Sequence, residues 1–306
     1  MFKQFDTCET IAMARANGRG RGIFLSTLIS ILLASLVPVV GSFIAAVPMV
    51  VMTILKSPDI DPSTISVPTL ELTIASLYAT VTATIFFMLY SRFAEKRNMR
   101  SLGFTKIKAI QHYVVGLIIG LVMFSAIIGI GVLVGAFQFN GIAENINWGV
   151  LLLVFGGFFF QGMSEEVICR GWIMTSVARK NSVLAGVIVN SVIFALLHLS
   201  NPGIGILPII NLTLFGVFAS VYMLKTDNIW GVSAIHTIWN FVQGSLFGLS
   251  VSGMEGMPTI FQFASTDNAL MNGGAFGPEG GLIVTVVLVI CIAVTMLVGN
   301  KKNDTK

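Results

Sequence analysis

The sequence predicts an all-α, polytopic membrane protein with about eight transmembrane helices and with both termini in the cytoplasm. Three observations predict this fold class. Of the 306 residues, 55% are hydrophobic and only 10% are charged, and the mean hydropathy is +0.88. Soluble domains carry charge on about 25% of their residues, so this composition excludes an ordinary soluble domain. Long apolar runs recur along the chain, and lysine and arginine are concentrated in alternate loops.

Eight apolar segments are predicted to cross the membrane as helices. They cover about 23–55, 69–90, 111–137, 148–178, 182–199, 208–224, 229–250 and 281–299. At 1.5 Å per residue, the first would be about 50 Å long, whereas the hydrocarbon core is about 30 Å thick. We therefore expect Pro38 and Pro48 to kink or break that helix. The turn-rich stretch 56–68 is predicted to be the loop that follows.

The predicted spans divide the chain into five parts, and no internal repeat is recognisable. A cytoplasmic segment, 1–22, precedes three transmembrane helices within 23–145. Four helices within 146–250 form the core that carries the polar motifs. An extracytoplasmic loop covers 251–280, and the last helix with a cytoplasmic tail covers 281–306.

The placement of basic residues sets the predicted orientation. If the N-terminus is cytoplasmic, every lysine and arginine except Lys56 and Arg170 lies in a cytoplasmic segment. This asymmetry predicts an even number of spans, and it fits a bacterial plasma membrane. The net charge of +4 reflects that placement and does not indicate a nucleic-acid partner. Cys8, Cys169 and Cys291 are scattered, so neither a disulfide framework nor a thiolate metal site is predicted.

Charged residues inside one predicted span are the first candidates for chemistry. Glu165, Glu166 and Arg170 lie within six residues, although an ionisable side chain at mid-bilayer costs roughly 2.5–3.5 kcal/mol on insertion scales. Glu166 and Arg170 are four residues apart, so they share a helix face and can form an ion pair. Glu165 is rotated by about 100° from Glu166, and we expect it to point into a cavity. A buried ion-pair network that only locks helices together is the alternative.

Two histidines and an asparagine in later spans complete the candidate set. His198 lies near the end of its segment, and His236 and Asn240 share a helix face because they are four residues apart. With Glu165, they suit hydrolysis. A carboxylate can take a proton from water, an imidazole can orient that water, and an imidazole with an amide can stabilise an oxyanion. His112, beside a basic connector, is interpreted as an interfacial residue.

A zinc site is also compatible with these residue types. Glu165, His198 and His236 are the candidate ligands if a zinc is present, since zinc accepts two histidines and a glutamate. The sequence has no H-E-x-x-H motif, and the three residues come from three different segments. The spacing therefore leaves zinc and metal-free activation of water both open.

These motifs resemble those of the CAAX prenyl endopeptidase and bacteriocin-processing (CPBP or Abi) family of intramembrane proteases. The resemblance covers about residues 150–245. The matching motifs are E-E-x-x-x-R at Glu165, Glu166 and Arg170, F-x-x-x-H at Phe194 and His198, and H-x-x-x-N at His236 and Asn240. One residue departs from the pattern: Cys169 stands before the arginine, where the family often has an aromatic residue.

The resemblance implies an intramembrane endopeptidase that acts on membrane-associated or lipidated (CAAX-type) peptides, or on bacteriocin-like precursors. Its implied partners are a peptide or protein substrate, prenylated or membrane-embedded, and the lipid bilayer. The implied roles are water activation by Glu165, support by Glu166 and Arg170, assistance in the attack by His198, and an oxyanion site at His236 and Asn240. Family members are described both as metalloproteases and as glutamate-dependent enzymes, so a zinc cofactor stays open.

Two other classes of function are compatible with the sequence. A non-catalytic bacteriocin-immunity or membrane scaffold protein can keep the same fold for partner binding. A secondary transporter also keeps ionisable residues inside the membrane, but it more often has two repeated halves. No such repeat is recognisable in this chain.

The depth of the candidate residues leads to one further expectation. Glu165 lies far inside its predicted span, whereas His198 lies almost at the end of its own. The two can meet if the helix that carries Glu165 extends beyond the bilayer or tilts, or if the chain at 199–207 stays below the membrane surface. The next predicted span, 208–224, is short, which favours the second arrangement. We therefore expect the turn at 200–203 to line a water-filled cavity, because irregular backbone at that depth must be buried in protein or wetted.

Overall fold

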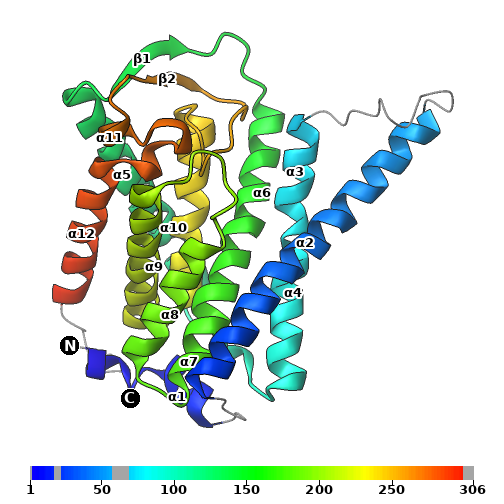
Figure 1. Ribbon diagram of the computed structural model, residues 1–306, viewed down its shortest axis with the longest axis vertical. Coiled ribbons are helices and arrows are strands. Elements are labelled where there is room, and N and C mark those ends of the chain that lie inside the picture. Colours follow the sequence, from blue (N-terminus) through cyan, green and yellow to red (C-terminus); the bar gives the residue numbers. More distant parts are fainter. Residues whose placement is uncertain (1, 17–21, 57–68, 299–306) are drawn as a thin grey trace.

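A bundle of long helices makes up the protein (Figure 1). The computed structural model describes residues 2–16, 22–56 and 69–298. The loop predicted at 56–68 lies outside these residues except for its first position, and the C-terminal basic tail also lies outside them. The described chain is an all-α, polytopic membrane protein, as the composition predicts.

Helices account for nearly all of the regular structure. The α-helices are α1 (Glu9–Ala16), α2 (Ile23–Lys56), α3 (Thr69–Ala79), α4 (Val81–Leu89), α5 (Ala109–Leu133), α6 (Trp148–Glu166), α7 (Thr175–Ala178), α8 (Val183–Leu196), α9 (Ile206–Thr226), α10 (Ile229–Phe241), α11 (Ala269–Asn272) and α12 (Leu282–Leu297). The π-helical segments are η3 (Tyr90–Ala94), η5 (Val167–Met174) and η6 (Val242–Leu246). The 3-10 segments are η1 (Phe2–Phe5), η4 (Met99–Leu102), η7 (Gly274–Phe276) and η8 (Pro278–Gly280).

Five helical stretches of the described chain are long and apolar enough to cross a membrane. They are Ile23–Pro48, Leu70–Ala94, Ala109–Leu133, Trp148–Ala178 and Ile206–Thr226. Two shorter apolar helices, α8 and α12, match two more of the predicted spans. The remaining predicted span, 229–250, forms α10 and η6. The number of eight membrane crossings therefore stays a prediction.

Helix α2 differs from the sequence-based expectation. The expectation was a kink or a break at Pro38 and Pro48, and the break is wrong, because one helix continues through both prolines from Ile23 to Lys56. A kink there stays a prediction. Figure 1 shows α2 crossing the bundle obliquely. A tilt lets a helix that is longer than the hydrocarbon core fit the bilayer without a break. In membrane helices, local adjustments can also satisfy the backbone groups that proline frees.

Helix α10 lies inside the bundle, where it packs against α5 and α6 (Figure 1). Nearly all of its side chains are buried. Two glycines of α5 permit the close approach: a Cβ at Gly116 would overlap the carbonyl oxygen of Gly231, and one at Gly120 would overlap the side chain of Ile238. Small residues four apart let two helix backbones come together. The fold thereby fixes the helix that carries His236 and Asn240.

Helix α8 ends at Leu196, at mid-height of the bundle in Figure 1, and the chain then turns towards α9. This turn packs against the chain that follows η6, at Ser252 and Phe276. Asn201 Nδ2 donates a hydrogen bond to the carbonyl of Ser252 at 2.9 Å. A Cβ at Gly203 would come within 2.5 Å of the backbone nitrogen of Phe276. The turn is therefore packed against the chain at Ser252 and Phe276, although Ser200, Pro202 and Gly203 are exposed.

Two short strands close one end of the bundle, and the sequence did not reveal them. Strand β1 (Phe137–Ile142) pairs antiparallel with β2 (Phe261–Ser265), and the register is irregular between Phe139 and Ile142. The pairing ties the loop predicted at 251–280 to the connection between α5 and α6. The ring of Phe139 contacts Phe263, with centroids 5.1 Å apart.

The two ends of the described chain lie at the opposite end of the bundle from the strands (Figure 1). Asp227 caps α1 there, since its carboxylate accepts hydrogen bonds from the backbone nitrogens of Glu9 and Thr10 at 2.9 and 3.0 Å. Arg100 bridges the same Asp227 and the side chain of Glu9. Ends on one side agree with an even number of crossings, and the cytoplasmic assignment of that side stays a prediction.

Candidate active site

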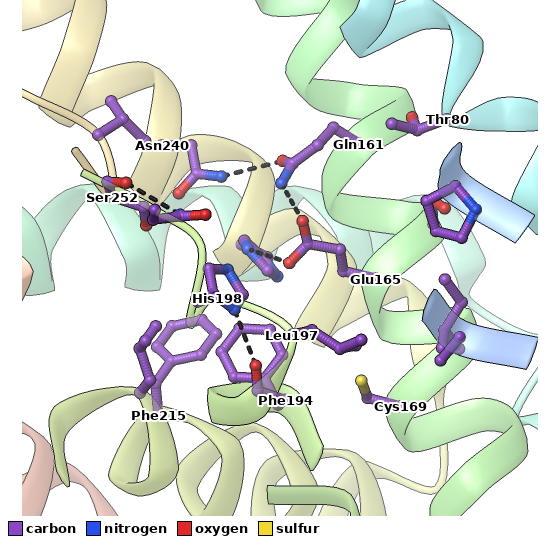
Figure 2. Close-up of a pocket in the computed structure, with 18 of the residues that line it drawn as sticks. Thr80, Gln161, Glu165, Cys169, Phe194, Leu197, His198, Phe215, Asn240 and Ser252 are labelled. Atoms are coloured by element: carbon purple, nitrogen blue, oxygen red, sulfur yellow. Dashed lines mark hydrogen bonds and ion pairs between the residues drawn. The ribbon is translucent and has the colours of Figure 1, made fainter. Parts of the chain in front are cut away.

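A cavity of about 940 Å³ opens inside the bundle (Figure 2). Helices α2, α3, α6, α8, α9, α10 and α12 contribute to its wall, and so does the chain near Val251. Most of the lining side chains are apolar. Four of the six predicted site residues line it: Glu165, His198, His236 and Asn240.

The two neighbouring glutamates have different surroundings. Glu165 and Glu166 end α6, immediately before the π-helical segment η5. The side chain of Glu165 is 27% exposed, and that of Glu166 is fully buried. Glu165 therefore faces the cavity as expected, and Glu166 points into the protein. π-Helical segments within α-helices often mark functional sites.

The buried carboxylate of Glu166 contacts two side chains in the interior of the bundle, those of Arg170 and His236. Its Oε1 accepts a hydrogen bond from Arg170 Nη1 at 3.0 Å, which is the predicted ion pair. The same oxygen lies 2.8 Å from His236 Nδ1, so this nitrogen carries hydrogen and donates it. The guanidinium of Arg170 also lies over the ring of Phe194, 4.6 Å from its centroid. A charge this deeply buried needs such partners.

Glu166 thereby sets the orientation of the His236 ring. With Nδ1 directed at Glu166, Nε2 points towards Glu165, and the two atoms Nε2 and Oε2 are 3.6 Å apart. This distance is too long for a direct hydrogen bond. His236 was predicted to act with Asn240, and its link to Glu166, seventy residues earlier, is an addition from the structure.

His198 follows α8 and presents one ring nitrogen to the cavity. Its Nδ1 lies 2.8 Å from the carbonyl oxygen of Phe194, one turn earlier. A carbonyl oxygen only accepts hydrogen bonds, so Nδ1 carries the hydrogen. In the neutral ring Nε2 is then an acceptor. His198 and Glu165 both line the cavity, and both are labelled in Figure 2.

Gln161 is a member of the site that the sequence analysis missed. Its Nε2 donates to Glu165 Oε1, and its Oε1 accepts from Asn240 Nδ2 at 2.9 Å (Figure 2). Gln161 therefore connects α6 to α10 across the cavity. One signal was present in the sequence: Gln161 precedes Glu165 by four residues and so shares its helix face.

The turn after His198 also contributes to the wall. Of the turn predicted at 200–203, Ser200 and Asn201 line the cavity, whereas Pro202 and Gly203 are not part of its wall. Their backbone is irregular, and the polar lining agrees with the rule that such backbone within a membrane borders protein or water.

The candidate zinc ligands do not form a metal centre. Within residues 2–16, 22–56 and 69–298, no three His, Cys, Asp or Glu side chains converge as metal ligands do. Glu165, His198 and His236 line one cavity without closing into a three-donor set. The described residues thus hold no assembled set of zinc ligands, and the structure does not support a metalloprotease.

A comparison with protein-family models places part of the chain in a described family model. Residues 145–242 match the model described as type II CAAX prenyl endopeptidase Rce1-like. This stretch contains all three motifs, and the resemblance inferred from them is confirmed over it. A search of curated proteins finds no match. The family match supports an intramembrane protease role.

Proposed function

Because residues 145–242 match the Rce1-like type II CAAX prenyl endopeptidases, we propose that this protein hydrolyses peptide bonds with a water molecule activated by Glu165. The observation that supports the proposal most strongly is the meeting of three helices at one cavity. Helix α6 brings Glu165, the end of α8 brings His198, and α10 brings His236 and Asn240. These are the groups that amide hydrolysis requires.

The first step is the attack of water on the substrate carbonyl. Among the described residues, no group donates a hydrogen bond to Glu165 Oε2. His198 Nε2 is a second acceptor on the same cavity. A water that donates one hydrogen to each presents its lone pairs to the carbonyl carbon. Glu165 takes the proton as the C–O bond forms, and it returns that proton to the leaving amine as the C–N bond breaks.

The second requirement is a pair of donors for the oxyanion. Asn240 Nδ2 uses one hydrogen on Gln161, and its second hydrogen is available to the substrate oxygen. His236 Nε2 is the other donor when the ring is protonated, a form that Glu166 stabilises through Nδ1. Donors fixed before the reaction are effective because little reorganisation is needed when charge develops.

The surroundings of the cavity indicate the substrate class. Ile31, Ala34 and Val39 of α2 and Leu72 of α3 line it, and much of α2 is exposed on its outer face. An apolar wall next to the bilayer suits a membrane-associated or lipidated peptide, or a bacteriocin-like precursor. The basic loops suit a bacterial plasma membrane.

Hydrolysis in ¹⁸O-labelled water tests this function. Purified protein in detergent is incubated with farnesylated and unmodified apolar peptides, and the products are measured by mass spectrometry. The proposal predicts cleavage, with one ¹⁸O in each new carboxyl terminus. A scaffold protein, an immunity protein or a transporter would leave every peptide intact in this assay. That result contradicts the proposal.

A further inference from the structure

The cavity contains a second carboxylate that the hydrolytic mechanism does not use. Glu279 lies on η8, in the loop predicted at 251–280, and it lines the same cavity as Glu165. No lysine or arginine is among the described residues that line the cavity. The wall thus carries two carboxylates and no permanently charged cation.

Neutral donors hold the side chain of Glu279. Its Oε1 accepts a hydrogen bond from Trp239 Nε1 at 3.0 Å. Its Oε2 accepts hydrogen bonds from the backbone nitrogen and the hydroxyl of Ser252 at 2.9 and 2.7 Å. A carboxylate offers about four acceptor sites, so about one is left. No cation of the described chain forms an ion pair with this carboxylate.

The backbone around Glu279 is held in place as well. Asn211 of α9 donates to the carbonyl oxygens of Glu279 and Gly281 at 2.8 and 2.9 Å. Gly277 has a φ of +94°, and a Cβ there would overlap the carbonyl oxygen of Ser250. The carboxylate therefore keeps its position at the wall. Its partner Trp239 and the proposed oxyanion donor Asn240 both line the same cavity as Glu279.

We propose that Glu279 selects peptide substrates that carry a cationic group close to the scissile bond. Such a group is a lysine or arginine side chain or a free amino terminus. In a cavity of low dielectric constant, an unneutralised carboxylate attracts a cation more strongly than it does in water, and it repels an acidic side chain. The inference rests on the proposed function, since the selected substrate occupies the same cavity.

The test compares two labelled peptides that differ only in charge. Both have an apolar half, and one position carries either arginine or its neutral analogue citrulline; the position is moved stepwise along the peptide. Binding is measured by fluorescence anisotropy on Glu165→Gln protein, so that the peptide stays intact. At the best position, arginine should bind about tenfold more tightly than citrulline. Glu279→Gln in the same background should remove this difference.

Glu255→Gln is the matched control, because Glu255 belongs to the same loop but borders a separate cavity. It should keep the preference for arginine. Equal affinity for the two peptides, no binding of the arginine peptide, or a preference that survives Glu279→Gln would overturn the inference. Equal weakening of both peptides by Glu279→Gln would also overturn it, since that result indicates a structural role.

A second measurement needs no variant at Glu279. On Glu165→Gln protein with Glu279 unchanged, affinity should fall in the order arginine, citrulline, glutamate at the selected position, and any other order contradicts the inference. The outcomes also separate it from the proposed function. Cleavage without charge preference removes only the role of Glu279, whereas charge-dependent binding without cleavage removes only hydrolysis.

Discussion

Adjacent residues Glu165 and Glu166 are separated by a rotation of about 100°, and this rotation gives them different environments. Glu165 borders the cavity, and Glu166 is fully buried between Arg170 and His236. We therefore assign proton transfer to Glu165 and structural support to Glu166. The two assignments predict that replacing glutamate by glutamine has different consequences at the two positions.

Glu166→Gln should reduce both stability and activity. The substitution leaves the guanidinium of Arg170, which is fully buried, without its counter-charge. Breaking a buried ion pair on one side costs about 3–5 kcal/mol. Thermal unfolding in detergent and peptide hydrolysis measure the two effects. Glu144→Gln, at an exposed position, is the control. An unfolding temperature equal to that of the wild type would show that Glu166 has no such role.

Gln161→Ala should lower kcat more than it changes KM. Without the glutamine, Asn240 and Glu165 lose the side chain that fixes both. Loss of one fixed oxyanion donor typically costs about 10²–10³ in kcat, and we expect about tenfold to 10²-fold, since Asn240 itself remains. Gln138→Ala, on exposed β1, serves as the control. A rise in KM at unchanged kcat would contradict a positioning role.

The sequence predicted one site contact between residues four apart, the ion pair of Glu166 and Arg170, but it missed the bond between Gln161 and Glu165 at the same spacing. The four-residue spacing of Glu166 and Arg170 was enough to predict their ion pair. The bond between Glu166 and His236 spans seventy residues, and that between Gln161 and Asn240 spans seventy-nine. Such contacts depend on how whole helices pack, which spacing along the chain does not encode.

Helix α10 is positioned by its packing against α5. This packing can be tested separately from the proposed hydrolysis. Gly116 and Gly120 leave no room for a side chain against α10, whereas a Cβ at Gly129 of the same helix would meet nothing within 4 Å. The difference is a feature of packing between two helices and does not involve the cavity wall.

Gly120→Leu should therefore destabilise the protein, and Gly129→Leu should not. Overpacking of a well-filled contact costs typically 1–3 kcal/mol, whereas changes at open positions stay within about 0.5 kcal/mol. Thermal unfolding of both variants measures the difference. Because α10 carries His236 and Asn240, Gly120→Leu should also lower activity. Equal unfolding temperatures for the two variants would contradict the packing described here.

The apolar runs of the sequence predicted where the helices lie. A break at the two prolines was predicted wrongly, and the two strands were not predicted. Each predicted span contains a helix, with ends that differ by a few residues. Pro38 and Pro48 did not break α2, because a tilted membrane helix tolerates both its excess length and its prolines. Strands β1 and β2 were missed because each is short and their pairing joins segments more than a hundred residues apart.

The whole molecule encloses a polar site within an apolar shell. Large exposed hydrophobic side chains are numerous on α2, α5, α8 and α12, where a bilayer would cover them. The match at residues 145–242 nearly coincides with the core predicted at 146–250. The flanking α3 and η8 nevertheless contribute Leu72 and Glu279 to the cavity. The complete cavity thus requires parts of the chain outside the matched stretch.

Hydrolysis by Glu165→Gln, compared with Glu144→Gln in the same assay, decides whether this cavity is an active site driven by that carboxylate. Glutamine keeps the size of the side chain but cannot take a proton from water. We predict that kcat falls by about 10²–10⁴ while the unfolding temperature stays near that of the wild type. A Glu165→Gln protein that cleaves peptides within a few-fold of the wild-type rate would contradict the mechanism.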